Sequence, residues 1–255
     1  MVFLPSMRNC TSQMTSIVFG GHSPIAIAIT NELSAVDTVH HVTRNPDVEL
    51  SKELKNSDKV ALHKLLFDRD NRFDFSHTIK LVLELNPKTI VFASRYRNTV
   101  FDAIDAFRFE LMLPIEILIQ VKDNLAQSNL KSVVFLTSPA GSKVVRNQEI
   151  YYHTNKAALE QIVRYYSLHM GGVRINGVSP GSFVMKSRSE EFYKSNPEVT
   201  NKIREFIPTS DFVHVHDIAK LVKFLTSDDS KQINGQIIGI DGGYRNWEES
   251  SHLLQ

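Results

Sequence analysis

The stretch YHTNKAALEQIVRYYSLHMGGVRINGVSPG, residues 152–181, joins a helical pattern to an apolar strand pattern that ends in a Pro-Gly turn. Its first residues place Tyr152 and Lys156 four positions apart, so a helix would put both side chains on one face. An ammonium group beside a phenol favours the phenolate and lowers the tyrosine pKa from about 10 towards neutrality. Such a tyrosine can exchange a proton with a reacting oxygen at physiological pH. Ser138 follows an apolar run upstream, and its hydroxyl could hold the same oxygen.

The order of these residues is more specific than the Tyr-x-x-x-Lys pair alone. Ser138 precedes the pair, and residues 173–181 form a strand pattern that closes on Pro180-Gly181. In this order the segment resembles the classical branch of the short-chain dehydrogenase/reductase family, and the resemblance extends over roughly residues 15–245. It implies that Tyr152 is the general acid or base and that Ser138 orients the reacting oxygen. It also implies that Lys156 lowers the tyrosine pKa and holds the nicotinamide ribose.

Composition describes an ordinary globular chain and excludes several classes of protein. Of 255 residues, 42% are hydrophobic and 22% are charged, with a net charge of +1. No basic run indicates binding to nucleic acid or to an anionic membrane, and no segment approaches the roughly 18 apolar residues that span a bilayer. The single cysteine, Cys10, excludes a disulfide framework and favours a cytoplasmic protein. His214 and His216 alternate without a third ligand, so we expect no metal site.

A strand, a glycine turn and a helix are predicted in succession from residue 16, which is the opening of a dinucleotide-binding unit. Against the family pattern Thr-Gly-x-x-x-Gly-Ile-Gly, Pro24 replaces the second glycine and Ala26 the third. Pro24 suits the first turn of a helix, but it lacks an N–H and brings a ring near the phosphates. The alternative is a structural turn that binds no nucleotide. The resemblance assigns cofactor contacts in this turn to Gly20, Gly21, Ser23 and Ile25.

Thr43 and Arg44 follow the second predicted strand, residues 38–42. NAD-selective folds usually carry an acidic residue here for the ribose 2′-hydroxyl, whereas arginine can bind a 2′-phosphate through two hydrogen bonds. We therefore favour NADP(H) over NAD(H), with a solvated Arg44 as the alternative. The resemblance adds further cofactor contacts at Asp68, Ala93, Tyr152, Lys156, Pro180 and Gly181.

Two departures from the family pattern precede Ser138. Residues 92–95 read Phe-Ala-Ser-Arg where the family has Asn-Asn-Ala-Gly. This places Arg95 near the cofactor cleft, where it could contact a phosphate, an acidic substrate or only solvent. Residues 100–125 predict one long apolar helix with a kink at Pro114. The catalytic Asn of the family falls on Glu110, which could keep the main-chain carbonyl that holds a relay water or could form an ion pair with Lys156.

Strand and helix patterns alternate over residues 16–243, which predicts an α/β fold. We expect a Rossmann-type, doubly wound, mainly parallel sheet with helices on both faces. Residues 1–14 are expected to be a loose N-terminal extension and residues 15–255 a single domain, with a substrate lid at about 182–210. Because family members often associate through long helices and the last strand, we expect a homo-oligomer, a dimer or a tetramer, and favour the homotetramer.

Two functions are compatible with these patterns. The first is hydride transfer between NADP(H) and the carbonyl or secondary alcohol of a small molecule. The second is binding of a nucleotide or a partner without hydride transfer, which the departures at Pro24, Ala26 and Glu110 would permit. The retained serine, tyrosine and lysine favour the enzyme, because a binding protein has no need of all three.

Overall fold

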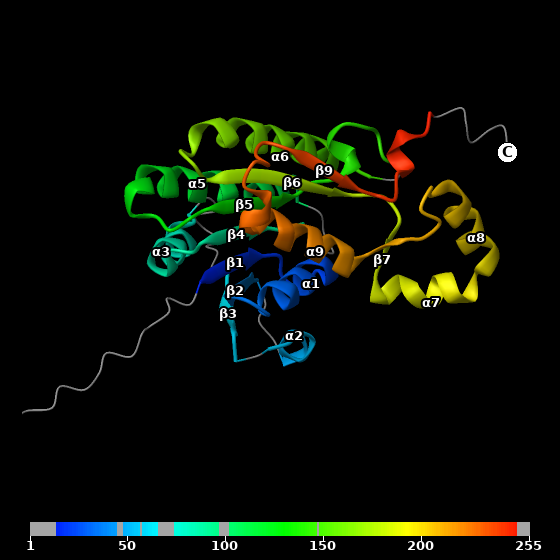
Figure 1. The fold of residues 1–255 in the computed structure, drawn as a ribbon, viewed down its shortest axis with the longest axis horizontal. Coiled ribbons are helices and arrows are strands. Elements are labelled where there is room, and N and C mark those ends of the chain that lie inside the picture. Colours follow the sequence, from blue (N-terminus) through cyan, green and yellow to red (C-terminus); the bar gives the residue numbers. More distant parts are fainter. Residues whose placement is uncertain are drawn as a thin grey trace, which may run out of the picture.

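A seven-stranded parallel sheet forms the centre of the computed structural model, which describes residues 14–44, 48–56, 58–65, 74–96, 102–146 and 148–248. The strand order is β3-β2-β1-β4-β5-β6-β9, and all six pairings are parallel (Figure 1). The strands are β1 (Thr15–Phe19), β2 (Thr38–Thr43), β3 (Val60–Lys64), β4 (Thr89–Phe92), β5 (Ser132–Leu136), β6 (Arg174–Pro180) and β9 (Ile237–Ile240). The predicted Rossmann-type fold class is confirmed.

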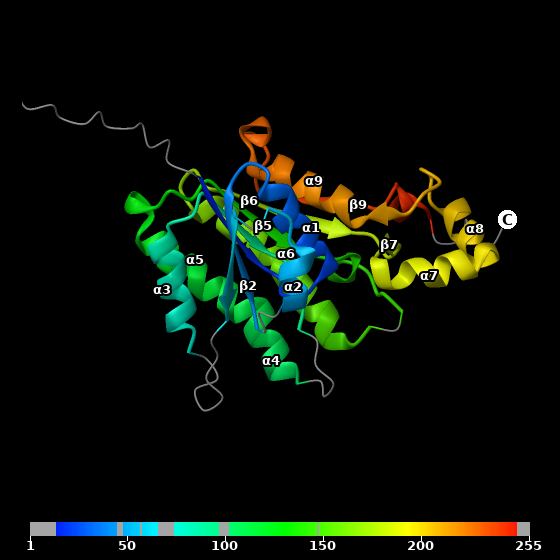
Figure 2. The same ribbon diagram turned by 90° about the horizontal axis from the view of Figure 1, so that it is seen from below.

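Helices cover both faces of this sheet. They are α1 (Pro24–Leu33), α2 (Val48–Glu53), α3 (Ser76–Leu85), α4 (Ala103–Phe107), α5 (Leu113–Asp123), α6 (Ile150–His169) and α9 (Val215–Thr226). Seen from below, α1 and α9 lie on one side of the sheet, and α3 and α5 lie on the other (Figure 2).

Successive strand residues feed two separate apolar layers. In β1, Ile17 and Phe19 belong to a core with α5 and α6, whereas Val18 belongs to a core with α1 and α9. Both faces of a parallel sheet are covered in this way, which is why the strands read as continuous apolar runs rather than as an alternation. The strand order also reverses at β1, which pairs with β2 on one side and β4 on the other. A crevice forms beyond the carboxyl ends of strands at such a switch point.

The helix predicted over residues 100–125 is interrupted. Helix α4 continues into a π-helical turn, Arg108–Met112, before α5 begins. Pro114 lies in the first turn of α5 and has no N–H for the carbonyl of Glu110, four residues earlier. The irregularity predicted at Pro114 therefore lies in the turn before it.

The predicted lid contains its own short elements. Strand β7 (Val184–Met185) pairs with β8 (Val213–His214) in a second, two-stranded parallel sheet. Between these strands lie α7 (Ser187–Ser195) and α8 (Pro197–Phe206), which project beyond one end of the main sheet (Figure 1).

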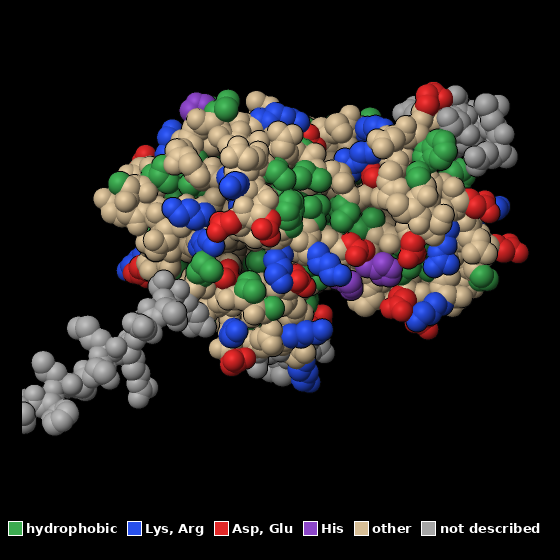
Figure 3. All heavy atoms as spheres, viewed as in Figure 1, with side chains coloured by type: hydrophobic (Ala, Val, Ile, Leu, Met, Phe, Trp, Pro, Cys, Tyr) green, Lys and Arg blue, Asp and Glu red, His purple; other side chains and the backbone are tan. Residues whose placement is uncertain are grey.

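One face of the molecule carries basic and acidic side chains interspersed rather than gathered by sign (Figure 3). Within the described ranges, no helix combines the length and apolar character needed to cross a membrane.

Candidate active site

Two adjoining cavities lie at the carboxyl ends of the central strands. The first, of about 280 Å³, extends from the glycine turn to the ends of β5 and β6, and the second, of about 270 Å³, lies between the ends of β1 and β2. Ser94 and Arg95, which follow β4, line both cavities. The two cavities therefore form one crevice that the segment after β4 crosses.

The structure brings Ser138, Tyr152 and Lys156 together in the first cavity. Ser138 follows the end of β5, and its Oγ accepts a hydrogen bond of 3.3 Å from the Ala140 amide. Lys156 is 4% exposed, donates from Nζ to the Leu136 carbonyl at 3.0 Å, and lies 5.7 Å from the centre of the Tyr152 ring. The hydrogen bond to Leu136 leaves the ammonium further N–H groups, since lysine has three.

The loop after Ser138 packs tightly on α6. A Cβ atom at Gly141 would lie 2.6 Å from the Glu160 carboxylate and 3.0 Å from the Lys156 carbonyl. Glycine at position 141 therefore allows the serine loop to approach the helix that carries Tyr152 and Lys156.

The glycine turn keeps its shape without two of the family glycines. Gly21 has a φ of 55°, a left-handed conformation that glycine adopts without strain. Pro24 is the first residue of α1, where no intrahelical N–H bond is lost. Ser23 precedes it with a hydroxyl that makes no capping bond to the helix. Ser23, Pro24 and Ile25 line the first cavity, and Gly20 and Gly21 line the second.

His41, which sequence reasoning did not single out, fastens this turn. Its Nε2 lies 2.9 Å from the Gly21 carbonyl and its Nδ1 lies 2.7 Å from the Thr30 hydroxyl. A carbonyl only accepts, so Nε2 carries the proton and Nδ1 accepts from Thr30. Burial lowers the His41 pKa to about 4; the Gly21 bond opposes this shift and the His22 charge adds to it. The imidazole is therefore neutral at physiological pH.

The second cavity has an aromatic wall and a basic residue. The Arg44 guanidinium lies 5.4 Å from the centre of the Tyr96 ring and 5.6 Å from that of Phe109, while Thr43 is buried beside it. Ala93 lines the first cavity. Asp68, the predicted adenine contact, lies outside the described residues.

Glu110 is buried and does not pair with Lys156. Its Oε1 accepts a hydrogen bond of 2.7 Å from the Tyr96 amide, while Lys156 Nζ is directed to the Leu136 carbonyl. Glu110 does not line either cavity. The ion pair with Lys156, one of the two roles considered from the sequence, is therefore not formed. The other role, a main-chain carbonyl that holds a water, stays open to Glu110, because Pro114 has no N–H to bond to that carbonyl.

Arg95 lies across the opening between the cavities. Its Cζ lies 4.2 Å from the centre of the Tyr152 ring, and its Nη2 donates to Gln148 Oε1 at 2.8 Å. Guanidinium groups at this distance are attracted to the ring face. Gln148 and Lys186 also line the first cavity, and the sequence had given no specific role to either.

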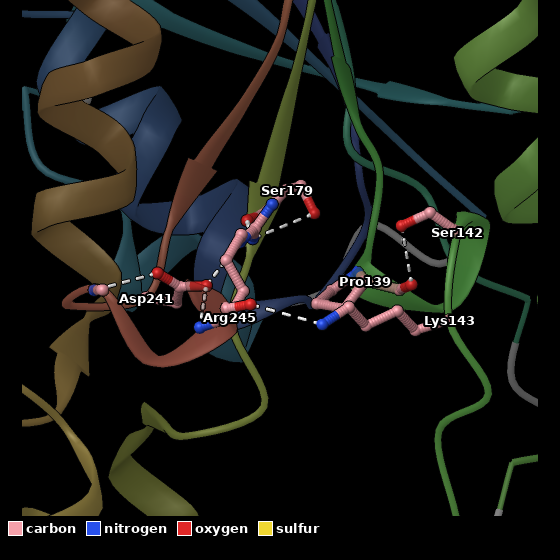
Figure 4. A network of polar contacts seen from close by, with 7 residues as sticks. Pro139, Ser142, Lys143, Ser179, Asp241 and Arg245 are labelled. Carbon is pink, nitrogen blue, oxygen red and sulfur yellow. Dashed lines mark hydrogen bonds and ion pairs between the residues drawn. The ribbon is translucent and has the colours of Figure 1, made fainter. Parts of the chain in front are cut away.

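Pro180 and Gly181 complete the first cavity at the end of β6. A polar network beside them includes Asp241 and Arg245 (Figure 4). Arg245 pairs with Asp241 through Nε and donates from Nη2 to the Ser179 carbonyl at 2.8 Å. Lys143 Nζ donates to the Arg245 carbonyl at 3.3 Å, which connects this network to the serine loop.

The described residues contain no group of three or more histidine, cysteine or acidic side chains able to hold a metal ion. Their arrangement instead fits a dinucleotide. The amides that open α1 have no intrahelical acceptor and can bind phosphate, and Arg44 stands at the other end of the crevice. This fold and its crevice define the class of dinucleotide-binding oxidoreductases.

Comparisons with known proteins agree with that class. A family model described as Enoyl-(Acyl carrier protein) reductase matches residues 107–245, more than half of the chain. A tropinone reductase homolog of Arabidopsis thaliana is 26% identical over 247 residues, covering 90% of this chain and 92% of its own length. An enoyl-[acyl-carrier-protein] reductase [NADH] of Buchnera aphidicola is 35% identical over 115 residues, covering 44% of this chain and 43% of its own length.

Solved structures show the same fold. A single-substitution variant of ElxO with NADPH bound superposes with a TM-score of 0.77 at 15% identity, over 92% of this chain and 100% of that chain. A 4-hydroxyisoleucine dehydrogenase complexed with NADH gives 0.75 at 20% identity, over 92% and 100%. The chain belongs to the short-chain dehydrogenase/reductase family. It is an NAD(P)-dependent oxidoreductase of that family, which favours the first of the two functions expected from the sequence over nucleotide binding alone.

Proposed function

We propose that this oxidoreductase interconverts a small-molecule carbonyl and the corresponding secondary alcohol with NADP(H), and that Tyr152 is its general acid and base. The observation that carries the proposal is the convergence of Ser138, Tyr152 and Lys156 in one cavity beside the glycine turn. The nicotinamide, when bound, supplies or accepts the hydride at the substrate carbon.

Each member of the cluster has a separate task in this proposal. Ser138 donates its hydroxyl proton to the substrate oxygen and orients the carbonyl. Tyr152 donates a proton to that oxygen during reduction and removes it during oxidation. Lys156 is held by the Leu136 carbonyl, so its ammonium lies near the ring where negative charge develops on the phenolate. Its remaining N–H groups can bind the hydroxyls of the nicotinamide ribose.

NADP(H) is proposed over NAD(H) because Arg44 lines the second cavity, where its guanidinium can bind a 2′-phosphate through two hydrogen bonds. The proposed contacts of Gly20, Gly21, Ser23, Ile25, Thr43, Ala93, Pro180 and Gly181 all surround the two cavities. The position of Asp68 remains a prediction from the resemblance.

The test substitutes Tyr152→Phe, which removes the transferable proton and keeps the ring. Turnover of carbonyl substrates should fall by about 10²-fold or more, while NADPH fluorescence titration gives an unchanged dissociation constant. Tyr151→Phe, on the adjacent and exposed residue, is the matched control and should keep native turnover. Native turnover in Tyr152→Phe would refute the assignment, and equal binding of NADPH and NADH would refute the cofactor preference.

We also propose that residues 15–255 form one domain with residues 182–210 as a lid, preceded by an extension of residues 1–14. A cytoplasmic homotetramer is the assembly proposed. Association between copies is supported by large apolar side chains that are exposed and that a second copy could cover. They are Ile104 and Phe107 on α4, Ile119 on α5, and Tyr165 and Leu168 on α6.

A further inference from the structure

Arg95 is a cation that lines the first cavity, and its contacts with the described residues include no carboxylate. Its guanidinium contacts the face of the Tyr152 ring and the side-chain oxygen of Gln148, and neither contact is with a carboxylate. No carboxylate among the described residues pairs with it. The family pattern has a small residue at this position, so the sheet itself does not require the arginine.

The lining of the same cavity has one sign of charge. Arg95, Lys156 and Lys186 contribute to it, and none of the described residues that line it is aspartate or glutamate. Walls of low polarity concentrate the potential of such charges inside a cleft. The cavity therefore attracts an anionic ligand in addition to the phosphates that the glycine turn can bind.

The backbone that carries Arg95 is fixed before any ligand binds. The Ala93 amide donates to the Phe19 carbonyl at 2.7 Å, and the Tyr96 amide donates to Glu110 Oε1 at 2.7 Å. The Tyr96 ring is also stacked on Phe109, with ring centres 6.1 Å apart. A guanidinium that is placed in advance loses less conformational freedom on binding an anion.

We propose that Arg95 binds a carboxylate of the substrate, and that the substrate is an oxo acid or hydroxy acid whose carboxylate lies one or two carbon atoms from the reacting carbon. The proposal rests on the proposed function, because Ser138 and Tyr152 hold the carbonyl oxygen. Since the guanidinium lies on the ring that carries the reacting hydroxyl, a group that reaches both must be short. Arginine presents paired N–H groups that match the two oxygens of a carboxylate.

The test compares acids with their uncharged amides on three proteins. Acetoacetate, acetoacetamide, 2-oxobutanoate and 2-oxobutanamide are titrated calorimetrically into the native protein, Arg95→Gln and Arg146→Gln, with and without NADP⁺. Arg146 is an exposed arginine of the same loop region as Gln148 and lines neither cavity, so it is the matched control. Oxidation of NADPH is followed with the same four compounds.

The native protein and Arg146→Gln should bind at least one acid about tenfold to a hundredfold more tightly than its amide, because a charge-assisted pair is lost with the amide. Arg95→Gln should bind acid and amide equally. The proposal is overturned if native protein shows no preference for either acid, or if the preference survives in Arg95→Gln. It is also overturned if Arg95→Gln weakens NADP⁺ instead, which would make Arg95 a cofactor residue.

Turnover separates this proposal from the proposed function. Arg95-dependent binding of an acid without oxidation of NADPH would contradict the proposed function and leave the carboxylate site in place. Equal reduction of acid and amide would support the proposed function and refute the carboxylate site.

Discussion

Pro24 and Ala26 replace two glycines of the nucleotide turn, and the residues around them accommodate both changes. The Ala26 methyl group lies against Gly20, so any side chain at position 20 would overlap it. His41 also stabilises the glycine turn, because its two ring nitrogens bind the Gly21 carbonyl and the Thr30 hydroxyl of α1. The close approach of β1 and α1 therefore depends on Gly20, which faces Ala26, and on the buried imidazole of His41.

His41 makes stability depend on pH. Its pKa is about 4 in the folded protein and about 6.5 in the unfolded chain, so the unfolded chain takes up the proton first as the pH falls. The stabilisation is complete above about pH 6.5 and is lost between about pH 6.5 and 4. From this residue alone, the free energy of unfolding should fall by about 3 kcal/mol across that window. Urea denaturation at pH 7.5 and 5 should show about 2 kcal/mol of this decrease, since pH 5 lies inside the window.

His41→Gln is the comparison, since glutamine does not titrate. Its unfolding free energy should vary less between pH 7.5 and 5 than that of the native protein. Some dependence should persist, because burial also lowers the pKa of His40 and of its hydrogen-bonded neighbour His63. Identical pH dependence in the two proteins would show that His41 is not the titrating group.

Among individual residues, the sequence predicted the candidate site residues that lie close to one another along the chain. Ser138, Tyr152 and Lys156 lie in one stretch with turn and helix signals between them, and the structure brings them together. The partners of His41 and Glu110 are set by strand pairing and by a π-helical turn. Neither arrangement has a periodic signature in the sequence.

The segment after β4 and the π-helical turn form one unit, because Glu110 Oε1 accepts from the Tyr96 amide. Both parts depart from the family pattern, Glu110 in place of asparagine and residues 92–95 in place of Asn-Asn-Ala-Gly. The two departures are complementary: the carboxylate holds the altered loop, and the loop positions Arg95 over Tyr152.

Glu110→Ala should leave the Tyr96 amide without its acceptor and lower the free energy of unfolding by about 1–3 kcal/mol. Hydrogen exchange of that amide should accelerate. Glu110→Gln keeps an acceptor oxygen and should retain slow exchange and near-native stability. Urea denaturation and site-resolved exchange measure both effects, and equal exchange in the two variants would contradict the proposed link.

Helices and strands rich in apolar residues could be predicted from the sequence. Elements whose position depends on contacts with distant segments could not. The helix over residues 100–125 was expected from its apolar residues, but its interruption lies before Pro114 because a proline also affects the carbonyl four residues earlier. Helices α7 and α8 were expected only as a polar lid. They contain few apolar residues and are located by β7 and β8, strands of two residues each.

Across the whole molecule, the C-terminal turn joins segments that lie far apart in the chain. Trp247 Nε1 donates to the Phe206 carbonyl of α8 at 2.9 Å, and the Thr209 amide donates to the Gly242 carbonyl at 3.2 Å. Arg245 connects Asp241 to Ser179 at the end of β6 (Figure 4). The proposed lid and the floor of the first cavity are thus attached to the same short segment.

Arg245→Met tests how far the site depends on that segment. The Asp241 side chain is 8% exposed, so loss of the guanidinium leaves a nearly buried charge without its partner. The free energy of unfolding should fall by about 2–3 kcal/mol, and the substrate KM should rise as the end of β6 loosens.

Asp241→Asn combined with Arg245→Met removes that charge, keeps an acceptor for the Gly243 amide, and should recover much of the stability. Because the double variant still lacks the bond to Ser179, its KM should stay raised. Recovery of both quantities together would mean that the unpaired charge, not the bridge to β6, had disturbed the site.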